Sequence, residues 1–392
     1  MNMLRFLTAG ESHGQGLLSI VEGMPAGVPL DVKTINADLA RRQLGYGRGG
    51  RMQIERDRVT LYSGVRHGST LGSPIGMGLQ NRDWVNWQDV MAVEEGSATP
   101  VVHPRPGHAD LAGALKYQHR DLRNVLERAS ARETAARVMA GSVAAGFLRT
   151  QGIFLISFTR ALGEITLGPT TEFESETPET TWHAWREQEG HTDFRCPDSE
   201  AEAKMRRSVD RAGAAGDTLG GVVEVQALGV PPGLGSYVHW DRKLDAQLAF
   251  AAMSVPGIKV VAIGDGIAAA QKLGSDVHDP IVPGDGSRRW QRTSNRAGGL
   301  EGGVTNGEPV VLRAHMKPIA TMKRPLDSVD FWDWQAAQAH HERSDVCAVP
   351  AAGVVVEAMV AFTLARAFLA KFGGDALTEI EANYARYREG WT

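Results

Sequence analysis

Two histidines lie in glycine-containing segments where their side chains could transfer protons. His13 follows a strand-like opening in "AGESHGQG", and His108 lies in "RPGHADLAG" beside Arg105 and Asp110. Imidazole titrates near neutral pH, so either histidine could give a proton to a departing oxygen or fix the protonation state of a neighbour. Both positions are equally consistent with hydrogen-bonded structural histidines.

A third candidate group is Asp345 in the segment "HHERSDVCAVPAAG", residues 340–353. The segment precedes an apolar helix, so Asp345 could simply cap that helix. Alternatively, it is an acid–base carboxylate beside an anion-binding Arg343, with His341 or the helix dipole setting its pKa. We expect Cys347 to be a small buried residue rather than a nucleophile, because no activating base accompanies it at a recognised spacing.

Arginines recur in or beside the glycine-rich turns and helix starts. Guanidinium groups bind phosphate and carboxylate oxygens in two-pronged geometry, and glycine lets a ligand approach the backbone. A solvated surface would explain any single arginine, but the repeated pattern predicts a small ligand with several negative charges. The residues are Arg42, Arg48, Arg51, Arg105, Arg123, Arg128, Arg132 and Arg343, together with Lys317.

The segment "RRQLGYGRGGRM", residues 41–52, contains the pattern G-x-G-x-x-G of dinucleotide-binding turns. We expect a helix before these glycines, ending at Gly45 with Thr34 or Asn36 as N-cap, and a strand over 52–65 after them. A dinucleotide fingerprint needs the reverse order, because the pyrophosphate sits at the N-terminus of the helix that follows the turn. This order disfavours a nicotinamide-dependent oxidoreductase.

A non-enzymatic anion-binding module is the other alternative. It would account for the arginines and glycines, but it gives no reason for His13, His108 and Asp345.

Composition limits the remaining possibilities. The 392 residues carry a net charge of -4, which gives no basic footprint for nucleic-acid binding. The two cysteines are too few for a disulfide framework, and no His or Cys spacing predicts a metal site. We expect a cytoplasmic protein without a signal peptide. The apolar stretch 354–372 carries three charged residues, which favours a buried helix over a membrane span.

The elements that would position these groups can be predicted from periodicity. Helical spacing is found over 121–150, 241–253 and 351–372, and strand-like segments are 222–230, 260–263 and 309–315. The similar segments "GSTLGSP" (68–74) and "GDTLGGV" (216–222) each lead into a strand-like stretch, which suggests an internal duplication. Residues 168–200 are polar and turn-rich, so we expect a polar surface excursion.

Taken together, these segments resemble the chorismate synthase family, in family order over nearly the whole chain. The matching stretches are "TAGESHGQGL" (8–17), "RRQLGYGRGGRMQIERD" (41–57), "GVRHGSTLGSPI" (64–75), "RPGHADLAGALKY" (105–117), "RNVLERASARETAARVMAG" (123–141), "GDTLGG" (216–221), "TSNRAGGLEGGVTNGEP" (293–309), "MKPIAT" (316–321) and "ERSDVCAVPAAGVVVEAM" (342–359).

The resemblance implies a lyase of the shikimate pathway that serves aromatic amino-acid biosynthesis. Members convert 5-enolpyruvylshikimate-3-phosphate to chorismate and phosphate by anti-1,4-elimination. They use reduced FMN without net redox change, so the flavin supplies the difficult electronic step and the protein supplies position, protons and charge. The inventory of arginines, histidines and a carboxylate agrees with such a flavoprotein.

Roles carried over from the family are assigned by position. His13 is expected to protonate the leaving phosphate, His108 to protonate the reduced flavin, and Asp345 to lie near flavin N5 and assist proton removal from C6. Arg42 and Arg48 match family positions that hold either NADP or the substrate's anionic groups. The expected flavin-binding residues are Arg128, Ala129, Ser130, Pro256, Gly257, Gly302, Lys317, Pro318, Ile319, Ala320, Thr321 and Arg343.

The chain departs from the usual family pattern at two places in this set. Pro256 and Gly257 stand where many members have Gln or Asn followed by Ala, and Ala320 stands where Ser is common. The first change removes a side-chain contact to the flavin but leaves backbone contacts, and the second removes a hydroxyl.

The family fold is a single α+β domain, here residues 1–392, with helices sandwiched between antiparallel sheets and assembly as a homotetramer. No additional domain for flavin reduction is recognised, so we expect an external flavin reductase to supply reduced FMN. NADPH would then enter only as a reductant for the flavin. No nucleic-acid or membrane partner is expected.

Overall fold

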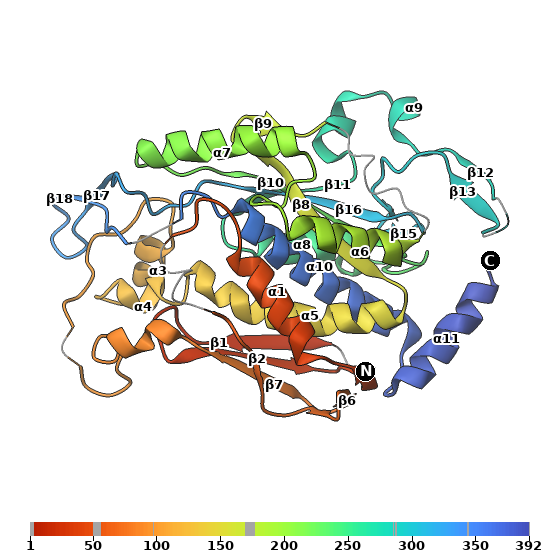
Figure 1. Ribbon diagram of the computed structural model, residues 1–392, viewed down its shortest axis with the longest axis horizontal. Helices are drawn as coiled ribbons and strands as arrows, with labels where there is room; N and C mark the ends of the chain where they lie inside the picture. The colour runs from red at the N-terminus through yellow and green to blue at the C-terminus, as the bar shows by residue number, and fades with distance from the viewer. Residues whose placement is uncertain are drawn as a thin grey trace.

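The computed structural model describes residues 4–49, 56–96, 98–168, 177–284, 286, 288–342 and 345–391. Two antiparallel sheets lie on either side of a layer of helices (Figure 1). The four-stranded sheet has the order β1–β2–β7–β4, and the five-stranded sheet has the order β11–β16–β10–β8–β9. The expected α+β class, with helices between antiparallel sheets, is therefore confirmed.

The strands of the four-stranded sheet are β1 (Arg5–Ala9), β2 (Gly16–Glu22), β7 (Ile75–Gln80) and β4 (Thr60–Leu61). Those of the five-stranded sheet are β11 (Ile258–Ile263), β16 (Val310–Met316), β10 (Gly221–Leu228), β8 (Phe154–Leu162) and β9 (Ile165–Thr166). A three-stranded sheet has the order β3 (Ala26–Pro29), β6 (Ser69–Leu71), β5 (Val65–Arg66). Three two-stranded sheets pair β12 (Ile281–Pro283) with β13 (Trp290–Arg292), β14 (Leu300–Glu301) with β15 (Val304–Thr305), and β17 (Asp327–Val329) with β18 (Ala336–Gln338).

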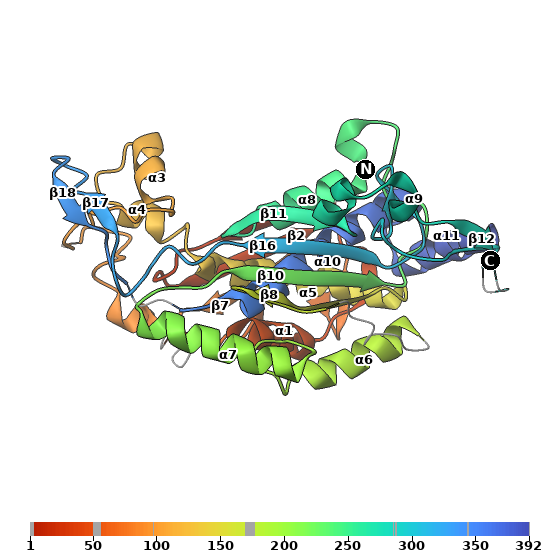
Figure 2. The ribbon, with the colours of Figure 1, turned by 90° about the horizontal axis from the view of Figure 1, so that it is seen from above.

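The α-helices are α1 (Val32–Gln43), α3 (Asp110–Tyr117), α4 (Arg123–Leu126), α5 (Thr134–Thr150), α6 (Pro178–Glu189), α7 (Ser199–Ala214), α8 (Leu244–Met253), α9 (Gly274–Val277), α10 (Val349–Phe372) and α11 (Leu377–Glu389). Figure 2 shows α3, α4, β17 and β18 at one end of the molecule, and α11 with β12 at the other. The predicted helices at 241–253 and 351–372 are confirmed as α8 and α10, and the three predicted strands are confirmed as β10, β11 and β16.

The middle layer is built mainly from α5 and α10. Helix α5 contacts β1 and β2 of one sheet, whereas α10 contacts β8 and β10 of the other. The two helices cross closely at Gly141, where a Cβ would lie 2.6 Å from Cα of Ala358. Helix α10 is long and apolar enough to cross a membrane by length and composition, but its apolar side chains are buried in this layer. The expectation of a buried helix is therefore confirmed.

The helix before the glycine-rich turn begins earlier than predicted. Its N-cap is Asp31, which accepts a hydrogen bond from the backbone N–H of Lys33 at 2.9 Å, rather than Thr34 or Asn36. Asn36 instead accepts a hydrogen bond from the backbone N–H of Val59 at 2.9 Å. Because side chains of α1 accept hydrogen bonds from backbone N–H groups of the following segment, those N–H groups cannot pair with a neighbouring strand.

The strand predicted over 52–65 is therefore mostly wrong. Residues 51–55 lie outside the described part of the chain, and strand pairing occurs only at Thr60–Leu61 and at Val65. The backbone N–H of Asp57 donates to the side chain of Gln43 at 3.1 Å, and so this segment is tied to α1. The described helix still precedes the glycines, which is the wrong order for a dinucleotide-binding turn.

The helix predicted over 121–150 is interrupted. Its two parts are α4 and α5, and a short 3-10 helix at Ala131–Glu133 lies between them. Ser130 has extended backbone geometry and its hydroxyl accepts a hydrogen bond from the N–H of Arg132 at 3.3 Å. The interruption turns the chain at residues 127–130, which is where flavin-binding residues were expected.

The segment predicted as a polar surface excursion, 168–200, contains a packed helix in its described part. Residues 169–176 lie outside the described part, and Pro178–Glu189 form α6, which packs on β8. Trp185 is fully buried, and its indole N–H donates to the carbonyl of Ser157 at 3.1 Å. Helix α6 buries one face, with Trp185 and Glu189, and exposes the other, with Glu179, His183 and Glu187, and composition alone does not show which polar residues are buried.

The two repeated segments each precede a strand, but in different sheets. Residues 68–74 lead into β7, and residues 216–222 lead into β10. An internal duplication stays a prediction.

Candidate active site

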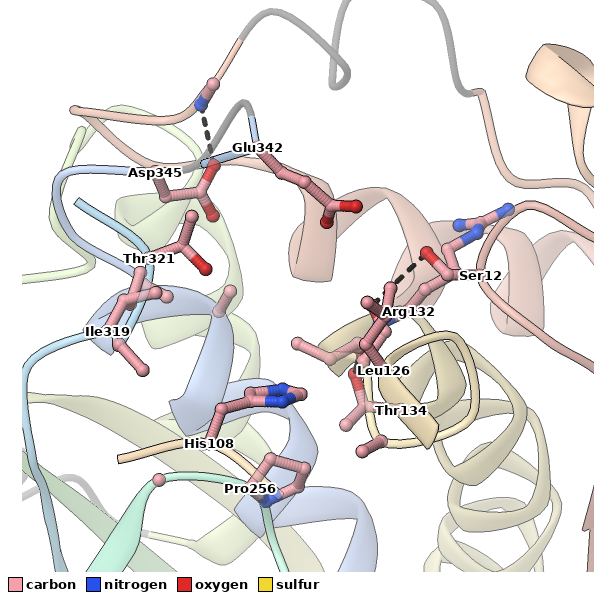
Figure 3. A pocket seen from close by; sticks show the side chains of 18 of the residues that line it. Ser12, His108, Leu126, Arg132, Thr134, Pro256, Ile319, Thr321, Glu342 and Asp345 are labelled. Carbon is pink, nitrogen blue, oxygen red and sulfur yellow. Dashed lines mark hydrogen bonds between the residues drawn. The ribbon is translucent and has the colours of Figure 1, made fainter. Parts of the chain in front are cut away.

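A cavity of about 750 Å³ brings together side chains from segments that are far apart in the sequence. Figure 3 shows the ring of His108 directed into it, with Asp345, Ile319 and Thr321 along one side and Ser12, Arg132 and Thr134 along the other. The predicted site residues that line it are His13, Arg42, Arg48, His108, Ala129, Ser130, Pro256, Gly257, Lys317, Pro318, Ile319, Ala320, Thr321 and Asp345.

Two predicted residues lie elsewhere, and a third falls outside the described residues. The exposed guanidinium of Arg128 donates to the carbonyls of Thr8 and Gly10, both at 3.1 Å, and the side chain does not line the cavity. Gly302 lies in the turn between β14 and β15, outside the cavity lining. Arg343 lies outside the described residues.

His13 is held by a buried carboxylate. Its Nδ1 lies 2.9 Å from Oε2 of Glu127 and 3.0 Å from Oε1, and its backbone N–H donates to Oε2 at 2.9 Å. The imidazole also stacks on Trp87, with ring centroids 3.9 Å apart. The His13 ring is therefore fixed by both an edge contact and a face contact.

His108 has a similar partner in Asp110, the first residue of α3. Nδ1 of His108 lies 2.5 Å from Oδ1 of Asp110, whose other oxygen accepts from Nε of Arg105 at 2.8 Å. Burial alone would raise the pKa of Asp110, but hydrogen bonds from His108 and Arg105 hold that pKa well below its usual range. Asp110 is therefore an acceptor, Nδ1 of His108 carries the shared proton, and Nε2 is the ring nitrogen available to the cavity.

Asp345 is joined to the glycine-rich turn. Its Oδ2 lies 2.8 Å from Nη1 of Arg48, and its Oδ1 accepts a hydrogen bond from the N–H of Gly49 at 2.6 Å. The glycines of the turn allow this approach, since Gly45 and Gly47 have positive φ angles of 124° and 78°. The turn that resembled a dinucleotide fingerprint thus positions a carboxylate and an arginine in the cavity.

Arg42 forms a buried charge cluster behind this turn. Its Nη2 lies 2.9 Å from Oδ2 of Asp57, while Arg132 donates to Oδ1 of the same carboxylate at 2.6 Å and to Asn81 at 2.9 Å. Burial lowers the pKa of Arg42 to about 10, which still leaves it cationic at neutral pH. Two guanidinium groups therefore share one carboxylate, so this wall of the cavity is positively charged.

The opposite wall combines backbone turns with one cationic side chain. Lys317 donates from Nζ to the carbonyl of Gly107 at 2.9 Å, and its backbone N–H donates to the carbonyl of Gly257 at 2.9 Å. Burial, with a smaller effect of the nearby Lys259, lowers the pKa of Lys317. Apolar residues of the cavity lining include Ala129, Ala131, Val255, Pro256, Ile319, Ala351, Ala352 and Val355.

Several cavity residues were not assigned a role from the sequence. Glu127 and Trp87 hold His13, and Glu342 lies 3.6 Å from Arg105 and 3.9 Å from Arg123. Glu127 stands four residues after Arg123, a spacing typical of any exposed helical ion pair, so nothing in the sequence marked its carboxylate as buried. Asp83 also lines the cavity, as do Arg105 and Arg132, which were expected among the anion-binding arginines. Among the described residues no cluster of His, Cys, Asp and Glu suited to a metal ion is found.

Comparisons with known proteins agree with the resemblance. A family model described as chorismate synthase matches residues 4–369. A chorismate synthase from Pelobacter propionicus is 54% identical over 399 residues, covering 99% of both chains, and one from Desulforudis audaxviator is 53% identical over 390 residues, covering 99% of this chain and 98% of the relative. A crystal structure of chorismate synthase superimposes with a TM-score of 0.78 at 41% identity, covering 100% of this chain and 98% of that chain. This chain belongs to the chorismate synthase family.

Proposed function

We propose that this protein converts 5-enolpyruvylshikimate-3-phosphate to chorismate and phosphate by an anti-1,4-elimination that requires reduced FMN. The single observation that carries the proposal is that His13, His108 and Asp345, which come from three distant segments, line one cavity with several cationic side chains. In this reaction the carbon–oxygen bond to phosphate breaks, a proton leaves C6, and the ring gains a double bond.

The charges in the cavity suit a substrate with one phosphate and two carboxylates. Arg42, Arg48, Arg105, Arg132 and Lys317 line the cavity together. Guanidinium groups bind such oxyanions in bidentate geometry, and water exclusion strengthens those contacts. Since Arg42 and Arg48 share the cavity with His13, we assign them to the substrate rather than to NADP, and NADPH enters only as a reductant for the flavin.

His13 is the proposed acid for the departing phosphate. Glu127 engages Nδ1, so the ring donates from Nε2, the nitrogen on the far side of the ring from Glu127. A proton delivered to the phosphate oxygen stabilises the leaving group as the carbon–oxygen bond breaks.

The cavity also fits a flavin. Its volume lies within the range of about 300–1,000 Å³ typical of small-molecule sites, and its lining includes apolar residues beside backbone turns and cations. Ala129, Ser130, Pro256, Gly257 and the run 317–321 would hold the flavin. A reduced flavin held by these residues would supply the electron density that makes the elimination feasible, without net redox change.

Two residues are the proposed proton donor and proton acceptor in this part of the cavity. His108 presents Nε2 to the cavity while Asp110 fixes its Nδ1, so it can hold and donate a proton there. Asp345 is oriented by Arg48 and Gly49 and is the proposed acceptor of the C6 proton. Fixed geometry makes such transfers efficient.

We also propose a cytoplasmic homotetramer that receives reduced FMN from an external reductase. The outer face of the four-stranded sheet supports assembly, because Leu7, Leu18 and Ile20 are 70%, 51% and 47% exposed on adjacent strands. Contiguous exposed apolar side chains favour protein contacts. Light scattering of the purified protein should report four copies, and replacing Leu18 and Ile20 by lysine should reduce the assembly.

The function is tested by anaerobic incubation of the protein with 5-enolpyruvylshikimate-3-phosphate, with and without reduced FMN. We expect phosphate and chorismate in equal amounts only when reduced FMN is present, with no net flavin oxidation. Stoichiometric flavin oxidation would indicate an oxidoreductase, and binding without product would indicate an anion-binding module. Either result would overturn the proposal.

A further inference from the structure

Glu127 contacts the segment Ser12–His13 through both its own backbone carbonyl and its own carboxylate. The backbone N–H of Ser12 donates to the carbonyl of Glu127 at 3.0 Å, and the backbone N–H of His13 donates to Oε2 at 2.9 Å. Nδ1 of His13 lies 2.9 Å from the same oxygen. One residue therefore fixes the main chain and the ring of His13 together.

The carboxylate of Glu127 is buried and its charge is balanced from the other side. Its side chain is 1% exposed, and its Oε1 accepts a hydrogen bond from Nη1 of Arg123 at 3.1 Å. A buried charge is costly unless it is paired and hydrogen-bonded. The pairing with Arg123 keeps Glu127 as an acceptor that faces donors on both sides.

Trp87 completes the enclosure of the His13 ring. Its indole ring stacks on the imidazole at an interplanar angle of 24°, and the guanidinium of Arg123 lies 5.2 Å from its ring centroid. The indole N–H donates to Oδ2 of Asp83 at 3.2 Å, which fixes the indole in turn. Because one edge and one face of the imidazole are occupied, rotation of the ring away from this pose would break several contacts.

We propose that Glu127 is a positioning residue that fixes the tautomer of His13, with Trp87 as the clamp that fixes its ring orientation. Glu127 accepts the Nδ1–H, so neutral His13 carries its proton on Nδ1, and Nε2 takes up and releases the proton that reaches the substrate. The carboxylate also stabilises the imidazolium before transfer, as a carboxylate does for histidine in other acid–base sites. The kinetic part of this inference rests on the proposed function, but the tautomer does not.

The substitution Glu127→Gln separates this role from simple packing. The amide has nearly the same shape, but it has one acceptor oxygen and one NH₂ group. If the NH₂ of Gln faces His13, it meets the backbone N–H of His13, which is also a donor, and it requires Nδ1 to be an acceptor. If the NH₂ faces Arg123, it meets the guanidinium group, which is also a donor. The amide therefore cannot satisfy both sides, and the share of the Nδ1–H tautomer falls.

The first measurement is nitrogen-15 NMR of histidine-labelled full-length protein at a pH where His13 is neutral, without substrate. The His13 signals are assigned by their loss in His13→Asn. We expect mainly the Nδ1–H tautomer in the wild type and a mixed population in Glu127→Gln. A wild-type ring that is mainly in the Nε2–H tautomer, or an unchanged population in Glu127→Gln, would overturn the proposal.

The second measurement is steady-state kinetics with reduced FMN. Glu127→Gln should lower kcat by about 10- to 100-fold with little change in KM, since Glu127 acts through His13. Trp87→Ala should also lower kcat, whereas Trp87→Phe keeps an aromatic face and most of the rate. The matched control is Glu22→Gln, which removes an exposed carboxylate paired with Arg5 and should change neither kcat nor the His13 tautomer. Circular dichroism checks that each variant is folded.

These two readouts fail independently. If the wild-type protein does not turn over the substrate, the proposed function is wrong, but the NMR result still decides whether Glu127 fixes His13. If turnover is normal in Glu127→Gln while its tautomer changes, Glu127 does not serve proton transfer and the positioning role is overturned.

Discussion

Nη1 of Arg48 lies 2.8 Å from Oδ2 of Asp345, so the glycine-rich turn holds the carboxylate that we assign to proton removal. The same carboxylate accepts the backbone N–H of Gly49 through its other oxygen. Arg48 was expected to bind an anionic ligand, and its nearest described anion is a catalytic candidate of this chain. A ligand bound at Arg48 would therefore also affect the orientation of Asp345.

Replacing Asp345 tests this coupling most directly. Asp345→Asn keeps an oxygen that can accept from Gly49 but cannot take up a proton, so kcat should fall by about 100-fold or more. Steady-state phosphate release measures the effect. Asp276→Asn, an exposed carboxylate on α9, is the control and should leave the rate unchanged. Full activity of Asp345→Asn would remove Asp345 from the mechanism.

The His108 pair makes a second kinetic prediction. His108→Ala should lower the rate by about 100-fold or more, because it removes a proton-transferring group that faces the cavity. Asp110→Asn should lower the rate less than His108→Ala, since the ring remains but loses the charged acceptor 2.5 Å from Nδ1. Single-turnover assays under anaerobic conditions compare the two variants. A larger loss in Asp110→Asn than in His108→Ala, with the fold intact, would contradict these roles.

The crossing of α5 and α10 predicts opposite effects for two glycines on one helix. Gly141→Ala places a methyl group 2.6 Å from Cα of Ala358 and should destabilise the protein by about 1–3 kcal/mol through overpacking. At Gly146 the nearest atoms to an added Cβ are 3.8 Å away, so Gly146→Ala should stabilise α5 by up to about 1 kcal/mol. Urea unfolding measures both changes. Equal effects would show that the helices do not cross at Gly141.

A buried ion cluster on α6 predicts acid sensitivity. Burial would raise the pKa of Glu189, but the charges of Arg195 and Arg41 outweigh it, so the pKa is lowered. Since the folded state binds this proton more weakly than the unfolded state, the stabilisation is present above the unfolded pKa of about 4.5 and is lost as the pH falls below it.

The test compares Glu189→Gln with Glu187→Gln, an exposed position on the same helix. At pH 7 the loss of the buried carboxylate should cost about 3–5 kcal/mol in the free energy of unfolding, because it removes the nearest carboxylate of Arg195 and leaves Glu357 at 3.7 Å. The difference between wild type and Glu189→Gln should stay nearly constant from pH 7 to about 4.5 and shrink as the pH falls further. A difference that grows at low pH would reverse the assigned sign.

Cys347 is predicted to be chemically inert. Its side chain is fully buried, and burial raises the pKa of its thiol to about 12. At pH 8 the thiolate share should be roughly 1,000-fold below that of an ordinary cysteine, in addition to steric protection. Mass spectrometry after iodoacetamide treatment should show alkylation only in denaturant. Rapid alkylation of the native protein would show that the thiol is accessible.

The sequence predicted the fold class and most of the cavity because their signals are long or strongly patterned. Helix α10 has an apolar run with a glycine stop, and the family-like segments place His13, His108 and Asp345 by position. The sequence predicted helix boundaries less well where several side chains could cap the same backbone N–H groups. Asp31 rather than Thr34 caps α1, because both are good capping residues and only the packing of the helix selects between them.

The remaining errors concern tertiary pairing of charge. The polar composition of 168–200 predicted an exposed segment, yet within it Trp185 is buried on β8 and Glu189 is surrounded by arginines. Glu127 likewise has an ordinary helical spacing from Arg123, and only the approach of His13 from a remote segment gives it a special environment. Composition shows which charged residues are present, but it does not show which of them form ion pairs in the folded protein.

The cavity takes its lining from residues as far apart as Ser12 and Val355, with contributions from both sheets' connecting segments and the helices between them. Because the lining comes from both ends of the chain, we expect turnover to appear only after the last core helix, α10, is in place. Recovery of turnover during refolding should then follow the slowest structural phase.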